Sequence, residues 1–143
     1  MFNVGGISTE NYVNIDQILA NTNFIAISAI VDNTAKGDDG KCLAGTPLNG
    51  DFTKRDGGAN AFTKATAGTA AEGTTPETPS NANCVLLHDI EFDGSNDANA
   101  TVLIKGTVQL KHMDSDVEEL YTALVIKALA AHGIDCINPT PAS

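Results

Sequence analysis

Alternating apolar and polar positions dominate the stretch from Asn83 to Met113, which we take as the centre of the fold. Side chains alternate between the two faces of a β-strand. In a first segment the alternation places these residues on one face: Cys84, Leu86, His88, Ile90 and Phe92. In a second segment it does the same for Val102, Ile104, Gly106, Val108 and Leu110. The polar residues between the segments include Gly94, Asn96, Asp97 and Asn99, which favour turns, so the pattern predicts a β-hairpin with one buried face on each strand.

Three further segments of the chain have clear patterns. Phe24 to Val31 is apolar on both faces, which predicts a central strand. Pro47 lacks a backbone N–H, so we expect its segment not to occupy a central position in a sheet. Residues 57–83 are rich in Gly, Ala, Thr, Ser and Pro and cannot offset their ordering entropy by burial. They predict a mobile loop, in which Phe62 is the one apolar anchor.

After the hairpin the hydrophobic period changes from two to 3.6 residues. The apolar stripe consists of Val117, Leu120, Tyr121, Leu124, Val125 and Ala128. It predicts one amphipathic helix over about residues 116–132. Ser115 is the expected N-cap, with Glu118 completing a capping box, and Gly133 is the expected stop. The chain after Ile134, with two prolines, is predicted to be a tail, of which residues 138–143 lie beyond the domain.

A chain of 143 residues fits one domain, which buries roughly 70% of the surface that its unfolded form exposes. We expect a mainly β fold of the α+β class, a small β-barrel over residues 15–137 with one C-terminal α-helix. Residues 1–14 are predicted to be an extended N-terminal arm, although a frayed terminus fits the composition equally well. The apolar residues of this arm are Phe2, Val4, Ile7, Tyr12 and Val13.

The charge and the cysteine content limit the classes of partner and the cellular compartment that we expect. Eighteen acidic and eight basic side chains give a net charge of −10, which opposes nucleic-acid phosphates and anionic lipid. We therefore expect neither nucleic acid nor a membrane as a partner. Three cysteines without C-x-x-C spacing favour reduced thiols and folding in a cytosol. The N-terminus lacks a basic region before an apolar segment, so we expect no signal peptide, and we expect no membrane span.

Candidate catalytic and metal-binding residues are few. His88, His112 and His132 have no second histidine at ligand spacing. The turn from Asp93 to Asn99 begins like a calcium loop, but Ala98 and Ile104 stand where that loop needs glycine and glutamate. Nucleophile-elbow, P-loop and dinucleotide-binding motifs do not occur in the sequence. We therefore expect no metal, no cofactor and no enzymatic activity.

Three segments, taken in order, resemble bacteriophage head-decoration proteins of the lambda type. They are Ala44 to Phe52 (AGTPLNGDF), Cys84 to Ile90 (CVLLHDI) and Thr101 to Val108 (TVLIKGTV). In that family a G-T-P-L turn, a variable loop, a strand of the V-L-L-x-D-V type and a Gly/Asn-rich turn precede a strand with a small residue midway. The resemblance covers about residues 30–110.

The resemblance implies a small β-rich domain, often described as a β-tulip, that forms a homotrimer. Such trimers sit on the outside of the expanded capsid, at threefold positions of a shell built from the HK97-type major capsid protein. There they cement the shell against the pressure of packaged DNA, so the implied location is the virion surface after assembly in the host cytoplasm. The family's N-terminal arm adds a strand to capsid β-structure, which assigns capsid binding to Phe2, Val4, Ile7, Tyr12 and Val13. The loop over residues 57–83 and the helix depart from short family members, so a monomer is the alternative to the trimer.

Two other functions are compatible with the sequence. One is a different virion component, such as a tail, spike or fibre β-domain that binds host glycans. The other is a small hydrolase or lyase whose site is assembled from dispersed residues.

Overall fold

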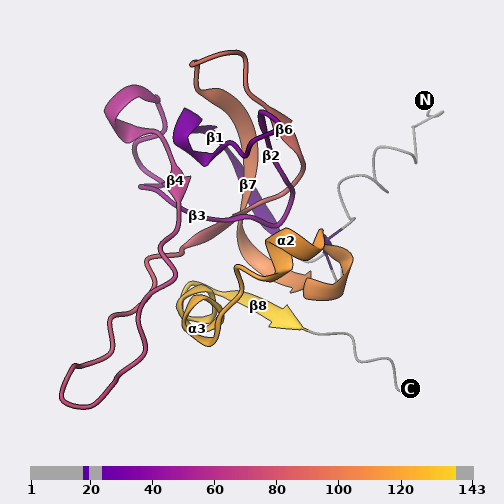
Figure 1. The fold of residues 1–143 in the computed structure, drawn as a ribbon. Coiled ribbons are helices and arrows are strands. Elements are labelled where there is room, and N and C mark those ends of the chain that lie inside the picture. The colour runs from indigo at the N-terminus through magenta and orange to yellow at the C-terminus, as the bar shows by residue number, and fades with distance from the viewer. Residues whose placement is uncertain (1–17, 20–23, 138–143) are drawn as a thin grey trace.

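The computed structural model describes residues 18–19 and 24–137, which form an antiparallel β-structure with one sizeable helix (Figure 1). The larger sheet follows the order β1 (Ile25–Val31), β7 (Ala98–Gln109), β5 (Cys84–Leu86), β3 (Pro47–Asn49) and β4 (Thr63–Lys64). Strand β8 (Ile134–Ile137) pairs in parallel with β7 outside this path. A second, two-stranded sheet joins β2 (Lys41–Cys42) and β6 (Ile90–Glu91). The helical elements are α2 (Ser115–Glu118), α3 (Ala123–Ala131) and the 3-10 turns η2 (Asn33–Ala35), η3 (Gly58–Asn60) and η4 (Leu110–His112).

The expected α+β class is confirmed, but the expected barrel is wrong for the described residues, because neither sheet closes. The end strands of the larger sheet approach each other only through an isolated bridge between Val31 and Phe62. The Asp32 N–H donates to the Phe62 carbonyl at 2.7 Å. One bridge of this kind does not continue into a ladder, so the sheet stays open.

Strand β7 pairs with more strands than any other in the larger sheet, namely β1, β5 and β8. The antiparallel pairing of the expected hairpin exists, because Val85 pairs with Leu103 and Leu86 with Val102. The long hairpin is wrong, however. Strand β5 stops at Leu86, and β6 leaves the ribbon to pair with β2. Alternation alone could not predict that β6 pairs with β2, because β2 lies outside residues 83–113.

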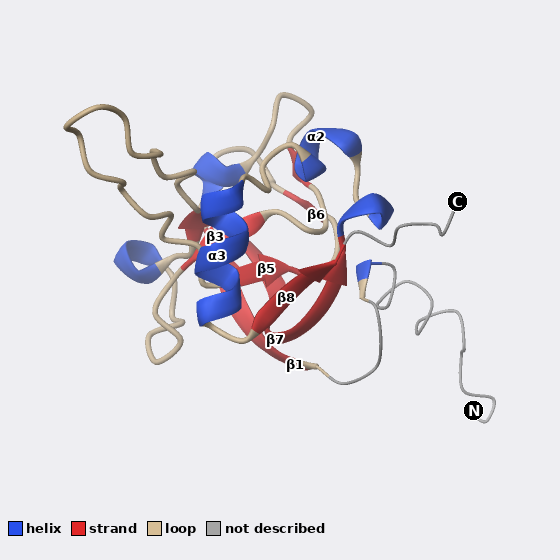
Figure 2. Cartoon of the chain, turned by 90° about the horizontal axis from the view of Figure 1, so that it is seen from below, coloured by secondary structure: helices blue, strands red, loops and turns tan. Residues whose placement is uncertain are grey.

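Both faces of β5 are buried, so the expected half-buried ribbon is also wrong. Val85 and Leu87 belong to a core cluster that includes the helices, here called the helix-side core. Cys84 and Leu86 belong to a second cluster around Phe62, here called the Phe62-side core. The centre of the sheet therefore separates two apolar cores. The helix side of this arrangement is visible in Figure 2, where α3 lies across the sheet.

A β-bulge in the middle of β7 changes which face its residues occupy. Ile25 pairs with Lys105 whereas Ala26 pairs with Leu103, so β7 has one extra residue at this point. Before the bulge Val102 lies in the Phe62-side core, and after it Val108 lies in the helix-side core. The prediction that Val102, Ile104, Gly106, Val108 and Leu110 share one face is therefore wrong beyond Ile104.

Strands β1 and β3 exchange the positions that the sequence predicted for them. β1 ends the strand order and is an edge strand, although it was expected to be central. Part of its edge is covered, because the Arg55 guanidinium donates to the Ser28 carbonyl at 3.0 Å. β3 lies between β5 and β4, so the expectation that Pro47 excludes a central strand is wrong. Proline is tolerated because Pro47 is the first residue of β3.

The segment over residues 57–83 begins with regular structure and continues as a long loop. Phe62 is wholly buried, which confirms it as the anchor, and Thr63–Lys64 form β4. After β4 the chain forms a long, narrow loop that projects away from the sheet in Figure 1 and returns to β5. Its two sides are bridged at Thr69 with Thr78 and at Glu72 with Thr75. The mobility of this segment stays a prediction.

The single helix expected over residues 116–132 is wrong, because the chain forms α2 and α3 with a break between them. Asp114 caps α2 through the Asp116 N–H, and Thr122 caps α3 through the Val125 N–H at 3.3 Å. At the break, the buried Tyr121 hydroxyl donates to the Gly45 carbonyl. The stop at Gly133 is confirmed, since this glycine has φ +90° after the C-cap of α3.

The residues after Gly133 differ from the expected tail. They form β8, which pairs in parallel with Gly106–Gln109, so the domain includes this strand. Among the helices of the described residues, none has the length and apolar character that a bilayer crossing needs.

The two caps give a direct test of the broken helix. Replacing Asp114 or Thr122 by Ala removes an acceptor for a free N–H, so each change lowers the free energy of unfolding by about 1 kcal/mol. Ser115→Ala is the matched control, because Ser115 lies inside α2 and its loss costs under about 0.5 kcal/mol. Urea denaturation measures all three. A larger loss for Ser115→Ala than for Thr122→Ala would contradict the break.

Candidate functional site

The arm residues predicted to bind capsid, Phe2, Val4, Ile7, Tyr12 and Val13, lie outside the residues that the structure describes, and their role stays a prediction. The structure does describe the place where the N-terminal segment joins the domain. Ile18 and Leu19 are 1% and 5% exposed and belong to the helix-side core. This junction is the candidate functional site.

The junction is attached to the C-terminal end of strand β7. Leu19 forms an antiparallel bridge with Val108, and the Gln109 side-chain amide donates to the Leu19 carbonyl at 3.1 Å. Two buried side chains and these backbone contacts fix where residues 1–17 meet the body. Leu19 is therefore attached to strand β7 by its backbone.

The C-terminal segment joins the domain at the same end of β7. Val108 pairs with Cys136 as well as with Leu19, so the two partners lie on opposite sides of β7. Neighbouring strands are about 4.8 Å apart, which places Leu19 and Cys136 roughly 10 Å from each other. Residues 1–17 and 138–143 consequently connect to one end of the domain.

Sequence reasoning missed this arrangement. Ile134–Ile137 contains an apolar alternation, Ile134 and Cys136, that is compatible with a strand, but four residues after a helix stop are too few to identify one. Its parallel partner lies about 28 positions earlier in the chain, and periodicity carries no information on such pairing. The burial of Ile18 and Leu19 had no sequence signal beyond their apolar character.

The three segments that carry the family resemblance form one continuous part of the sheet. The Gly45 N–H donates to the Leu86 carbonyl at 2.7 Å, and the Leu86 N–H donates to the Thr46 carbonyl at 3.0 Å. Strand β5 then pairs with β7. Gly45 has φ +96°, and a Cβ there would lie 2.7 Å from the Met113 sulfur, so this turn requires glycine.

The acidic turn at residues 93–97 uses its oxygens for structure. The Asn33 side-chain amide donates to the carbonyls of Gly94 and Asn96 at 3.0 and 2.9 Å. The Asn33 N–H donates to the Asp97 carboxylate at 3.0 Å, and the Lys36 ammonium donates to the Gly94 carbonyl. These bonds attach the turn to η2.

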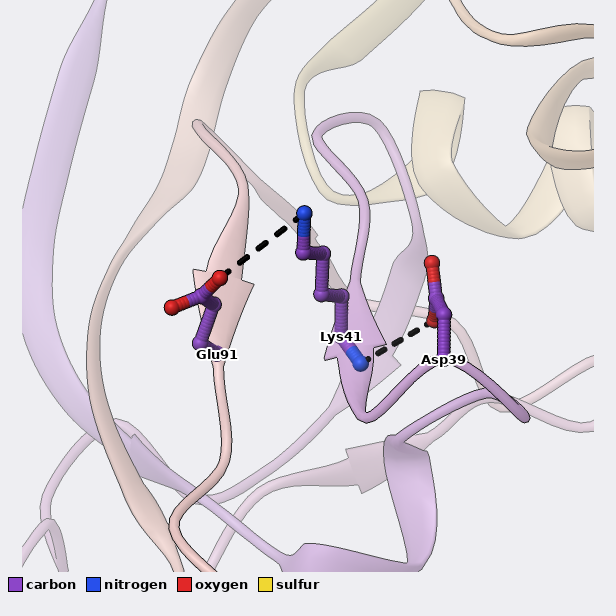
Figure 3. A network of polar contacts seen from close by, with 3 residues as sticks. All are labelled: Asp39, Lys41 and Glu91. Carbon is purple, nitrogen blue, oxygen red and sulfur yellow. Dashed lines mark hydrogen bonds and ion pairs between the residues drawn. The ribbon is translucent and has the colours of Figure 1, made fainter.

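Carboxylates near the small sheet likewise stabilise local structure (Figure 3). The Asp39 carboxylate accepts from the Lys41 N–H at 3.1 Å, which closes the turn before β2. The Lys41 ammonium and the Glu91 carboxylate form an ion pair at 3.7 Å across β2 and β6. Both side chains are largely exposed, so this pair contributes little to stability.

The histidines His88, His112 and His132 are exposed and come from different elements. Within residues 18–19 and 24–137, no three His, Cys, Asp or Glu side chains are grouped as a metal ion would require.

Burial makes the thiols poor nucleophiles. It raises the pKa of Cys84 to about 12 and that of Cys136 to about 11, and it also raises the pKa of Cys42. The thiolate is the reactive form of cysteine, so these groups react slowly near neutral pH. All three cysteines are free.

The buried Cys84 thiol makes stability depend on pH. Its folded-state pKa of about 12 exceeds the usual value near 9, so above pH 9 the unfolded state loses the proton first. The free energy of unfolding therefore falls as pH rises from 9 toward 12. Urea denaturation at several pH values under reducing conditions should show this fall, with a shallower slope in Cys84→Ala. Tyr121, whose pKa burial also raises, is retained in that variant, so equal slopes in both proteins would contradict the role of Cys84.

No protein-family model, curated protein sequence or solved structure matched the chain. The family resemblance of the three segments therefore enters the functional argument as a proposal.

Proposed function

We propose that this chain is a viral structural protein that binds the outside of an expanded bacteriophage capsid and stabilises the shell against internal DNA pressure. The proposed partner is a major capsid protein of the HK97 type, and the proposed location is the virion surface. The protein acts in this proposal by shape and by multiple attachment, without a reacting group.

One observation carries the proposal. The three segments that resemble decoration proteins form adjacent parts of one sheet, from the turn at Gly45 through β3 and β5 to β7. The informative contact is that of the first segment with the second, because residues 53–83 separate these two in the chain. Their adjacency supports a shared structural origin for the segments.

The junction at Leu19 supports the attachment mechanism. A clamp that resists outward pressure needs its flexible or extended part connected to a well-packed element, and Leu19 is fixed to β7 inside the helix-side core. In the proposal, residues 1–14 add a strand to capsid β-structure, which uses backbone hydrogen bonds that are indifferent to most side chains.

Symmetry provides the strength of attachment. A homotrimer at a threefold position engages three arms at once, and effective concentration then raises the overall affinity by a factor of roughly 10² to 10⁴ without new contacts. The monomer remains the alternative, and it would need stronger contacts per subunit.

Deletion of residues 1–14 tests the attachment mechanism. The truncated protein should keep the fold, because it retains the buried Ile18 and Leu19, and it should lose binding to expanded capsids. Co-sedimentation with expanded and unexpanded capsids measures binding, and circular dichroism checks the fold. Binding of the truncated protein at wild-type affinity would show that the arm is not the attachment.

The oligomeric state is tested separately. Sedimentation at micromolar concentration should give a boundary at three times the chain mass. A single boundary at the mass of one chain would contradict the trimer and leave a monomeric decoration protein.

A further inference from the structure

A polar cavity lies at the edge of the larger sheet, where β1 and β7 run side by side (Figure 2). Its volume of about 440 Å³ falls within the range of roughly 300 to 1,000 Å³ that small-molecule sites occupy. None of the described residues that line it is acidic, although the chain has 18 acidic side chains. We call it the edge cavity, and the side chains that define it are Ser28, Ile30, Arg55, His88, Asn99 and Thr101.

Two directly paired positions of β1 and β7 form the floor of the edge cavity. Ser28 pairs with Thr101, and Ile30 pairs with Asn99. Paired side chains point to the same side of a sheet, as do side chains two residues apart on one strand. This is the side on which Leu103 enters the helix-side core. Leu103 is wholly buried, Thr101 is half-buried, and Ser28 and Asn99 are exposed, so the helical cover ends at the cavity and leaves two hydroxyls and an amide open to a ligand.

Arg55, the single arginine of the sequence, forms one wall of the edge cavity. Its guanidinium donates to the Ser28 carbonyl at 3.0 Å, which holds the group beside the outer edge of β1. The ion pairs formed among the described residues do not include Arg55. A guanidinium has five N–H donors in a planar fork that matches two oxygens of a carboxylate or a phosphate. Arg55 therefore keeps donors for an oxyanion in the cavity.

His88 forms the opposite wall. The Leu87 N–H donates to the Thr101 carbonyl at 3.0 Å, so the next residue, His88, lies beside β7 on the side away from β1. Adjacent strands are about 4.8 Å apart, which places the two walls roughly 10 Å from each other. The exposed imidazole of His88 has one donor and one acceptor in its neutral form. A cavity of this width admits one sugar ring with a charged substituent.

The carboxylates that neighbour the walls in sequence are engaged elsewhere. The Asp89 carboxylate accepts from the Ala44 N–H at 2.7 Å, and the Asp56 carboxylate accepts from the Asn60 side-chain amide at 2.8 Å. Neither carboxylate lines the edge cavity. The positive charge of Arg55 is therefore available to an anion, in spite of the net charge of −10 over the whole chain.

We propose that the edge cavity binds a small hydroxylated anion, namely a monosaccharide that carries a carboxylate or a phosphate group. Arg55 binds the oxyanion through its fork. Ser28, Asn99 and Thr101 form hydrogen bonds with the hydroxyls of the ring. The described residues that line the cavity include no aromatic side chain, so a nucleobase would lack a surface on which to stack. This site is separate from the candidate functional site, and it does not depend on the proposed function.

NMR titration of the full-length, isotope-labelled protein tests the site with glucuronate, glucose 6-phosphate and uncharged glucose. Both anions should shift the amide signals of Ser28, His88 and Thr101 saturably. Glucose lacks the oxyanion, so it should bind about tenfold more weakly or not at all. Inorganic phosphate and acetate lack the ring hydroxyls and should also bind more weakly than the sugar anions.

Variants of the arginine test its role. Arg55→Gln removes the charge and the fork, so it should bind either sugar anion about tenfold more weakly than the wild type. Arg55→Lys keeps the charge without the fork and should recover part of the loss. The matched control, Lys54→Gln, removes the same charge from the neighbouring residue, which does not line the cavity, and should bind normally. Both side chains are exposed, so all three variants should fold.

Each outcome decides for or against the edge cavity. The absence of saturable shifts with both sugar anions would overturn the proposal, and so would equal affinities for glucose and the anions. Arg55→Gln that binds as tightly as the wild type, or inorganic phosphate that binds as tightly as glucose 6-phosphate, would contradict it as well. Binding of only one sugar anion supports the site and identifies the oxyanion. None of these measurements involves a capsid, so failure of the proposed function leaves their interpretation unchanged.

Discussion

The backbone pairing of strand β7 along its whole length is the constraint on which the rest of this structure depends. Its first half pairs with β1 and β5, and its second half pairs with β8 and with Leu19. A residue such as Leu103 is completely buried because helices cover one side of the sheet and the Phe62-side core covers the other. The helices, β8 and the N-terminal junction are all positioned relative to this one strand.

The bulge at Lys105 allows one strand to serve two environments. Without the extra residue, Val108 would continue on the side of Val102, and the helix-side core would lose its contact with the end of β7. With it, apolar residues follow the core, and polar residues such as Thr107 turn outward.

The sequence predicted those features that depend on local chemistry. Alternation identified β1, β5 and β7, and Gly133 marked the end of α3. The 3.6-residue period identified Val117, Tyr121 and Val125 as buried but missed Leu129, which is wholly buried. The sequence failed where long-range pairing decides the outcome. Nothing local indicates that Ile90 pairs with Cys42, that Pro47 begins a central strand, or that Thr122 restarts the helix. The site was inaccessible for the same reason, because Leu19 and Cys136 meet β7 only through tertiary structure.

The proposed function combines a resemblance in three segments with a geometry in which Leu19 and Cys136 both pair with Val108, at one end of β7. Its central claim is that this end of β7 faces the shell. An electron cryomicroscopy map of expanded capsids saturated with the protein tests the claim most directly. We expect density over the threefold positions, with Leu19 and Ile137 nearest the shell. Bound domains whose β7 directs that end away from the shell, or shells without added density, would contradict the account.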